Sequence, residues 1–376
     1  MSIFSLFPYP TTRHGQDQLL QGLWEDWDKY DVHVIEAPTG FGKTPIAKTV
    51  LNWRVNASYI APTNMLVEQF LREFPQTPTL AKRSSYWCDT WRRKCEQTVR
   101  KEGGYCRGCA CGKDRRVAIY GTREGAYNYH IYNANNLHRE VLVVDEAHNL
   151  INFLRDQKKK IMWQHTLNYP NEVRTYKDVK EWLETYPKSK LGKRREMLLE
   201  EVSKARPNYL ISRGKFPWNG SGTKRGFPED RDALEMVPLD IHEYGPQLLW
   251  PKGKVNKIVL LSATINEVDI KTLGLNEKRV RYYKCPSPIP RENRPVHYIP
   301  VAGVNRLKFQ ESTEKIAGFI RDELLPQHEG EAGVIHATYA QATILKKYLG
   351  SEPRLIWHSP KNAREMYEYW RNTPRE

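Results

Sequence analysis

The sequence predicts an α/β fold built on a parallel sheet that helices cover on both faces. Four short, almost wholly apolar runs recur along the chain, and segments with helical character separate them. Strands that are buried on both faces have this continuous apolar character, whereas half-exposed strands alternate between apolar and polar residues. The strands expected on this basis are residues 32–36, 58–62, 141–144 and 257–261.

Each expected strand is followed by a feature typical of the carboxyl edge of a parallel sheet. A glycine-rich loop and a helix from Thr44 to about Trp53 follow the first strand. A helix at residues 64–74 follows the second, an acidic pair the third, and Ser262-Ala263-Thr264 the fourth. Because ligands bind beyond the carboxyl ends of parallel strands, this edge is the expected ligand site.

The loop from Ala37 to Thr44 has the composition of a phosphate-binding loop, although Ala37 replaces the first glycine of the general pattern. Its glycines let backbone N–H groups close on phosphates at a helix N-terminus, and its lysine adds positive charge. The structural alternative is a glycine-rich turn with an exposed lysine, but the strand before and the helix after favour ATP binding. The expected nucleotide contacts are Thr39, Gly40, Phe41, Gly42, Lys43 and Thr44, with Thr44 on Mg²⁺.

The second chemical motif is Asp145-Glu146-Ala147-His148, directly after a buried strand. One carboxylate can hold Mg²⁺ while the other polarises the attacking water, which is what phosphoryl transfer requires. An isolated acidic pair at a strand end is more often part of a helix N-cap region. With a phosphate-binding loop in the same chain, catalysis by Lys43, Asp145 and Glu146 is the better interpretation.

Five of the six cysteines lie within 24 residues between these two motifs. In a reducing compartment, clustered cysteines are more often metal ligands than disulfides. Four thiolates can hold either a [4Fe–4S] cluster or Zn²⁺, and spacing alone does not choose between them. The candidates are Cys88, Cys95, Cys106, Cys109 and Cys111.

The formal net charge of +15 is concentrated in two segments. Residues 81–116 hold 11 Lys/Arg against 4 Asp/Glu, and residues 151–220 hold 16 against 8, so the rest of the chain is balanced. This distribution indicates polyanion binding, although a single run such as 158–160 is more often a solvated surface. No apolar run approaches the roughly 20 residues of a membrane span, and no secretory leader is evident. We therefore expect an intracellular protein, cytoplasmic or nucleoid-associated, with no membrane partner.

Two stretches interrupt the alternation of strands and helices. Residues 81–116 hold the cysteines, and residues 151–250 are expected to be helical, for example at 176–186 and 194–205. A second unit begins near Arg294, with a helix around 314–325 and a strand at 333–336.

Together the motifs resemble the XPD/DinG family of superfamily 2 iron–sulfur DNA helicases. The loop and the acidic pair carry the resemblance, and further family-like motifs fall in the same order along the chain: Arg13-x-x-Gln16, Ala61–Gln69, Asn128-Tyr129, Ser262–Thr264, residues 287–294 and residues 333–339. The resemblance implies a RecA-like motor domain at residues 1–80, 117–150 and 251–293, and an incomplete second RecA-like domain at residues 294–376. It also implies an iron–sulfur insertion at 81–116 and a helical arch-like insertion at 151–250.

The resemblance assigns roles to individual residues. It implies that Gln16 reads adenine, and that Thr63, Asn64 and Gln69 contact a DNA backbone. It implies that His148, Ser262 and Thr264 couple the ATP state to the grip on DNA. It favours a [4Fe–4S] cluster on Cys88, Cys95, Cys106 and Cys109, because Arg115 and Ala118 follow Cys109 at the family spacing; Cys111 is the alternate ligand. Beside the cysteines, Arg92, Arg93 and Lys94 are expected to follow single-stranded DNA or DNA junctions.

The sequence departs from the family at its end, where no Gln-x-x-Gly-Arg-x-x-Arg pattern is found. We expect a partner or a further C-terminal segment to supply the missing arginine fingers. The function expected is that of an ATP-dependent DNA helicase or translocase with 5′→3′ polarity, on resemblance alone. The alternatives are an ATP-binding factor that clamps DNA without unwinding it, and a zinc-bearing RNA helicase.

Overall fold

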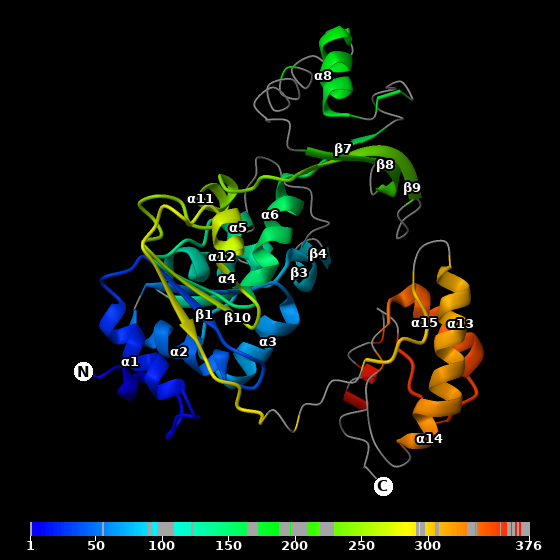
Figure 1. Ribbon diagram of the computed structural model, residues 1–376. Coiled ribbons are helices and arrows are strands. Elements are labelled where there is room, and N and C mark those ends of the chain that lie inside the picture. Colours follow the sequence, from blue (N-terminus) through cyan, green and yellow to red (C-terminus); the bar gives the residue numbers. More distant parts are fainter. Residues whose placement is uncertain are drawn as a thin grey trace. The chain divides into compact units, whose positions relative to one another are not determined.

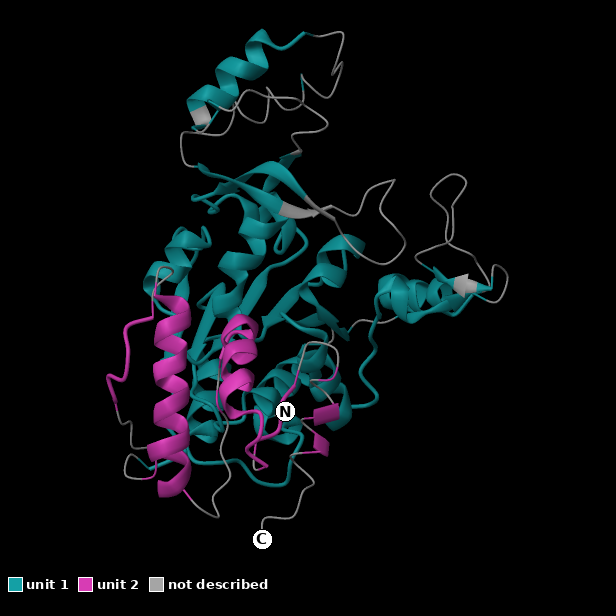
Figure 2. Cartoon of the chain, turned by 90° about the vertical axis from the view of Figure 1, so that its right-hand side faces the viewer, with its two compact units in different colours: residues 1–290 teal, residues 291–376 magenta. Residues whose placement is uncertain are grey.

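The computed structural model describes most of the 376-residue chain. The described residues are 2–54, 56–88, 92–95, 109–121, 124–163, 172–173, 175–187, 196, 209–218, 229–290, 293, 298–304, 308–328, 335, 337–353, 355–358, 362, 365–366 and 368–369. They form two compact units, residues 1–290 and residues 291–376 (Figure 2). The boundary lies close to Arg294, where the sequence predicts the start of a second unit.

The first unit is built on a six-stranded sheet in the order β11-β1-β10-β6-β2-β5, and every neighbouring pair is parallel. Figure 1 labels β1 and β10 of this sheet. Val34 in the middle of β1 pairs with Leu260 on one side and with Tyr282 on the other. The predicted parallel α/β sheet is therefore confirmed, with the RecA-like strand and loop order. The strands are β1 Val32–Glu36, β2 Ala57–Ala61, β5 Glu124–Asn128, β6 Val141–Val144, β10 Lys257–Ser262 and β11 Val280–Lys284.

Helices cover both faces of this sheet and create two separate apolar cores. Along β1, Val32 and Val34 belong to one core and Ile35 to the other, because successive strand side chains point to opposite faces. Helices α1 Gln16–Asp26, α2 Lys43–Trp53 and α3 Asn64–Glu73 pack on the Ile35 face, and α5 Tyr129–Asn135, α6 Leu150–Lys158 and α12 Glu267–Thr272 on the opposite face.

Two strands of the sheet were not expected from the sequence. Edge strand β5 contains Gly125 and ends in Asn128. Edge strand β11 contains two tyrosines between Arg281 and Lys284, and all its residues are exposed or partly exposed. Gly125 and Asn128 interrupt the apolar character of β5, and charged residues interrupt that of β11, so neither has the continuous apolar run that identifies β1, β6 and β10.

The prediction that residues 151–250 are helical is partly wrong. Helix α8 Tyr176–Thr185 is present and begins with a capping box at Thr175, but residues 194–205 lie outside the described part except for 196. Three strands form an antiparallel sheet in the order β7-β9-β8: β7 Lys160–Trp163, β8 Tyr209–Trp218 and β9 Glu229–Pro238. Their charged residues alternate with the apolar side chains that face α8, so the segment looks uniformly polar along the sequence.

The cysteine segment contains a short hairpin and a helix. Strands β3 Trp87–Cys88 and β4 Arg93–Lys94 pair antiparallel, and α4 Ala110–Arg116 continues into a π-helix at Val117–Gly121. Other short elements in the described part of the first unit are 3-10 helices at Ile3–Leu6, Arg83–Ser85 and Ala147–Asn149, and α11 Tyr244–Leu248.

The second unit contains a helical core. Helix α13 Phe309–Phe319 continues through a π-helix at Ile320–Leu324 into α14 Leu325–Gln327, and α15 Tyr339–Leu349 packs against α13. The helix expected near 314–325 is therefore confirmed with wider bounds. The strand expected at 333–336 lies outside the described residues except for 335. Within the described part of the chain, no helix has the length and apolar character needed to cross a membrane.

A buried histidine in β1 gives the first unit a specific pH dependence. His33 is fully buried, its ring stacks on Trp27 at 5.1 Å between centroids, and its Nδ1 lies 3.2 Å from the Tyr283 hydroxyl. Burial lowers the pKa of His33 to about 4. Between that pH and the ordinary histidine pKa, the unfolded chain binds a proton that the folded chain does not.

Acid is therefore expected to weaken the fold through His33. The destabilisation caused by His33 is absent above about pH 6.5 and grows to about 3 kcal/mol as the pH falls to 4. The free energy of unfolding therefore decreases between these two pH values. Denaturant unfolding at pH 7 and pH 4.5 should show a smaller pH difference in His33→Phe than in the wild type. Replacement of exposed His14 by glutamine should leave the difference unchanged; equal pH differences in all three proteins would contradict the prediction.

Candidate ATP-binding and hydrolysis site

The phosphate-binding loop connects the carboxyl end of β1 to the first residue of α2. Gly40 and Gly42 have φ angles of +85° and +90°, in the left-handed region that side chains disfavour. A Cβ on Gly42 would also clash with the side-chain amide of Gln16. The loop is tied to the neighbouring strand where the Ala37 N–H donates to the Ser262 carbonyl at 2.8 Å. Glycine is therefore required at both positions for this backbone path.

Gln16 and Arg13 support the loop from α1 and the residues before it. The buried Gln16 amide donates to the Phe41 carbonyl at 2.7 Å and to the Gly42 carbonyl at 3.3 Å, and its oxygen accepts the Arg13 N–H at 2.7 Å. The Arg13 guanidinium donates to the Gly40 carbonyl at 2.9 Å. In this structure the Gln16 side chain is thus occupied by the loop backbone rather than directed outward to a base.

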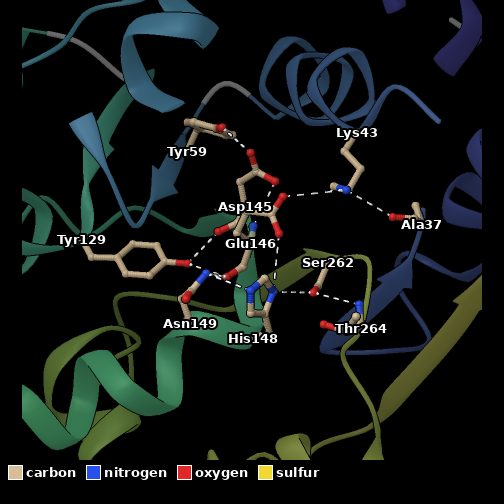
Figure 3. A network of polar contacts seen from close by, with 10 residues as sticks. All are labelled: Ala37, Lys43, Tyr59, Tyr129, Asp145, Glu146, His148, Asn149, Ser262 and Thr264. Carbon is tan, nitrogen blue, oxygen red and sulfur yellow. Dashed lines mark hydrogen bonds and ion pairs between the residues drawn. The ribbon is translucent and has the colours of Figure 1, made fainter. Parts of the chain in front are cut away.

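Lys43 starts α2 and reaches back across the loop (Figure 3). Its Nζ donates to the Ala37 carbonyl at 3.2 Å and lies 3.9 Å from Glu146 Oε1, with only 12% of the side chain exposed. Thr44 follows it on the first turn of the helix and is partly buried. The lysine predicted from the loop motif is therefore placed beside a carboxylate of the acidic pair.

Asp145 is the buried member of the acidic pair, with 6% of its surface exposed. Tyr59 donates its hydroxyl proton to Oδ2 at 2.7 Å, and the Glu146 N–H donates to Oδ1 at 3.0 Å. Burial raises the pKa of Asp145, while the Tyr59 hydrogen bond acts in the opposite direction. Its carboxylate is held in one orientation at the carboxyl end of β6.

Glu146 has a left-handed backbone, with φ of 47° and ψ of 48°. For a residue with a Cβ this conformation costs about 1–2 kcal/mol. It turns the chain from β6 into the 3-10 helix. It also places the carboxylate between Lys43 Nζ at 3.9 Å and the imidazole Nδ1 of His148 at 3.4 Å. Strained residues of this kind concentrate at functional sites.

The histidine of the acidic motif is linked to the end of β10. His148 Nδ1 lies 2.9 Å from Ser262 Oγ, which accepts the Thr264 N–H at 3.2 Å (Figure 3). Asn149 Nδ2 lies 3.0 Å from His148 Nε2. The three residues assigned to coupling are therefore joined in one chain of polar contacts, from Glu146 to Thr264.

The predicted DNA-contacting residues are exposed. Thr63 caps α3 by accepting the Leu66 N–H at 3.3 Å, and Asn64 and Gln69 lie on the surface of that helix. In the β3–β4 hairpin, Arg92 and Lys94 are exposed, and Arg93 lies in β4 with its side chain outside the described part. These positions are accessible, and nothing in the geometry assigns them a nucleic acid.

The cysteines have unequal surroundings. Cys88, Cys95 and Cys111 are buried, and Cys109 caps α4 by accepting the Gly112 N–H at 3.3 Å. Cys106 lies outside the described residues. Among the residues that are described, no group of three or more His, Cys, Asp or Glu side chains is arranged to hold a metal. The donor atoms suit a thiolate-bound metal, but the described thiols do not by themselves form its cage.

Two functional neighbours were missed by sequence reasoning. Tyr59 and Tyr129 both place their hydroxyls on the acidic pair, from 86 and 16 residues away along the chain. A tyrosine inside a buried strand is an ordinary core residue by pattern, so no local signal identifies Tyr59. Tyr129 belongs to the family-like pair Asn128-Tyr129, but the resemblance assigned it no role.

The fold and the site define a RecA-like α/β domain, with a phosphate-binding loop beside an acidic pair. Residues 14–177 match the family described as DEAD/DEAH box helicase, and this range contains both the phosphate-binding loop and the acidic pair. No curated protein matches the sequence significantly.

Solved structures of XPD helicases share the fold over nearly the whole chain. An XPD helicase has a TM-score of 0.54 at 11% identity, with 97% of this chain and 79% of that one covered. Xpd4 of S. tokodaii gives 0.53 at 15% identity over 96% and 79%, and an apo XPD gives 0.52 at 12% over 93% and 75%. At these identities the similarity concerns the fold.

Proposed function

We propose that this protein is an ATP-dependent DNA helicase or translocase of the XPD/DinG type, with 5′→3′ polarity. The observation that carries the proposal is the acidic pair beside the loop lysine, with Glu146 Oε1 3.9 Å from Lys43 Nζ. The fold shared with XPD helicases supports the choice of family, and the two basic segments support a nucleic acid as the partner.

The proposal divides the chain by role. Residues 1–80, 117–150 and 251–293 form the first motor domain, and residues 294–376 belong to the second. Residues 81–116 form the iron–sulfur insertion, and residues 151–250 form the arch-like insertion. The antiparallel sheet of β7, β8 and β9 is then part of the arch-like insertion.

Nucleotide binding would use the loop backbone and three side chains. The N–H groups of residues 39–44 would surround the phosphates, and Lys43 would offset the charge of the terminal phosphates. Mg²⁺ would be held by Thr44 and Asp145 and would neutralise phosphate charge. The buried, doubly hydrogen-bonded Asp145 carboxylate supports this role, because its oxygens are already fixed in direction.

Hydrolysis would use Glu146 as the general base. Its carboxylate would accept a proton from water as the water oxygen bonds to the γ-phosphorus. The bond from that phosphorus to the β–γ bridging oxygen breaks, releasing ADP and phosphate. Release of the phosphate would change the contacts of the Glu146 carboxylate. The polar contacts from Glu146 to His148, from His148 to Ser262 and from Ser262 to Thr264 would transmit this change to the end of β10.

Strand displacement tests the proposed function. Duplexes with a 5′ or a 3′ single-stranded DNA tail, and a matched 5′-tailed RNA duplex, are incubated with protein, ATP and Mg²⁺. We expect displacement of the 5′-tailed DNA only. ATP-dependent binding without displacement would indicate a clamp instead, and preference for the RNA duplex would indicate an RNA helicase.

We further propose that Cys88, Cys95, Cys106 and Cys109 hold a [4Fe–4S] cluster, with Cys111 as the alternate ligand. The burial of Cys88 and Cys95, the N–H···S contact at Cys109, and the family resemblance support it. Anaerobically purified protein should contain about four irons per chain and a broad visible absorption band. Cys88→Ser should lose the iron, whereas Cys285→Ser, in the segment after β11, should keep it. Zinc in place of iron would contradict the cluster.

A further inference from the structure

The acidic pair is held from inside the protein by two tyrosine hydroxyls. Tyr59 lies in the middle of β2, and Tyr129 is the first residue of α5, so the two approach the end of β6 from different elements (Figure 3). Each ring is buried, with 1% of its surface exposed. Neither residue belongs to the loop motif or to the acidic motif.

Tyr59 fixes the direction of the Asp145 carboxylate. Its hydroxyl donates to Oδ2 at 2.7 Å, and the ring is held in place by stacking on Phe70 at 4.1 Å between centroids. With the Glu146 N–H on Oδ1, each carboxylate oxygen has one fixed donor. Each oxygen retains lone-pair capacity for a further partner.

Tyr129 acts on the backbone of the strained residue. Its hydroxyl lies 2.6 Å from the Asp145 carbonyl oxygen and 3.3 Å from the Glu146 carbonyl oxygen. The carbons of these two carbonyls are the ends of the torsion that defines φ of Glu146, which is 47°. A single buried hydroxyl near both oxygens therefore restricts that torsion. It also restricts the direction in which the Glu146 side chain leaves the backbone.

We propose that Tyr59 and Tyr129 are positioning residues for ATP hydrolysis: Tyr59 sets the Mg²⁺-binding carboxylate of Asp145, and Tyr129 sets the left-handed turn that aims Glu146. The inference rests on the proposed ATP hydrolysis at this site. It adds that the geometry of the acidic pair is imposed by the core of the domain as well as by the motif itself. Groups that orient metal ligands or catalytic side chains typically change metal affinity or activity by about 10–100-fold when removed.

The test removes one hydroxyl at a time. In Tyr59→Phe, the Mg²⁺ concentration that half-saturates binding of a fluorescent ATP analogue should rise by about tenfold. In Tyr129→Phe, kcat for ATP should fall by about tenfold, with KM for ATP and the Mg²⁺ requirement close to those of the wild type. This separation of metal affinity from turnover is not expected if the two hydroxyls only stabilise the fold.

Tyr132→Phe is the matched control. Tyr132 lies on the same helix as Tyr129, is fully buried, and donates its hydroxyl to the Leu249 carbonyl at 2.9 Å, away from the acidic pair. It should lose thermal stability like the other two variants while keeping kcat and the Mg²⁺ requirement. If all three variants changed stability alone, or changed kcat equally, the inference would be overturned.

Failure of the proposed function would be visible separately. A wild-type protein that binds the analogue but hydrolyses no ATP with single-stranded DNA present would overturn the proposed helicase. The Mg²⁺ titration of Tyr59→Phe against Tyr132→Phe would still decide the role of the tyrosine, because it needs nucleotide binding only. An unchanged half-saturating Mg²⁺ concentration in Tyr59→Phe would overturn the inference even in an active enzyme.

Discussion

Replacement of Lys43 by alanine is expected to lower DNA-stimulated ATP hydrolysis by about 10²–10³-fold and to weaken ATP binding. The Lys43 ammonium is held between the loop and the acidic pair, with 12% of its side chain exposed and contacts to Ala37 and Glu146. Without it, the phosphates would lose a charge-assisted partner, and Glu146 would lose its nearest lysine. Equilibrium binding of a fluorescent ATP analogue and steady-state phosphate release measure the two effects.

Lys48→Ala is the control for loss of charge on the same helix. Lys48 lies on α2 and pairs with Glu124 at 3.3 Å, on a strand distant in the sheet order from β1. We expect its removal to leave ATP binding within about twofold of the wild type, because Lys48 pairs with Glu124 and shares no partner with the loop. If the two alanine variants lost activity equally, the effect would reflect helix stability rather than phosphate contact.

The parts of the fold that could be predicted are those whose burial is uniform. Strands β1, β6 and β10 lie inside the sheet with helices on both faces, so their residues are almost all apolar and stand out in the sequence. Edge strand β11 and the hairpin of β8 and β9 mix charged and apolar residues, because one face or one edge meets solvent. Their strand character depends on pairing partners far away in the chain.

Some residues of the site could be predicted from short sequence motifs, whereas the contacts that orient them could not. Lys43 and Asp145 follow from short motifs, because the loop and the strand end are each built within a few residues. The orientation of Asp145 depends on Tyr59, 86 residues away, and the path of the loop depends on Gln16, 25 residues from Phe41. Such contacts arise only when the sheet brings β1, β2 and β6 to a common edge, so the motifs alone could not reveal them.

Replacement of Glu146 by glutamine is expected to separate ATP binding from hydrolysis. Glutamine keeps the size and the hydrogen-bonding reach of the side chain but cannot accept a proton from water, so kcat should fall by about 10²–10³-fold. Affinity for ATP should stay equal or increase, because one negative charge is removed beside the phosphates while Lys43 remains. Binding of an ATP analogue and single-turnover hydrolysis, measured on the same preparation, give both quantities.

Glu140→Gln provides the matched control, since Glu140 directly precedes β6 and is exposed at the opposite end of the strand from Glu146. That variant should keep full turnover, which would show that the loss in Glu146→Gln arises at the nucleotide. Retention of more than a third of wild-type kcat by Glu146→Gln would place the general base elsewhere. Because Asp145 is buried and its two oxygens already accept from Tyr59 and the Glu146 N–H, it is poorly placed to replace the lost base. Residual hydrolysis by Glu146→Gln should therefore be low. Its dependence on the Mg²⁺ concentration should equal that of the wild type, because Asp145, the residue proposed to hold Mg²⁺, is unchanged.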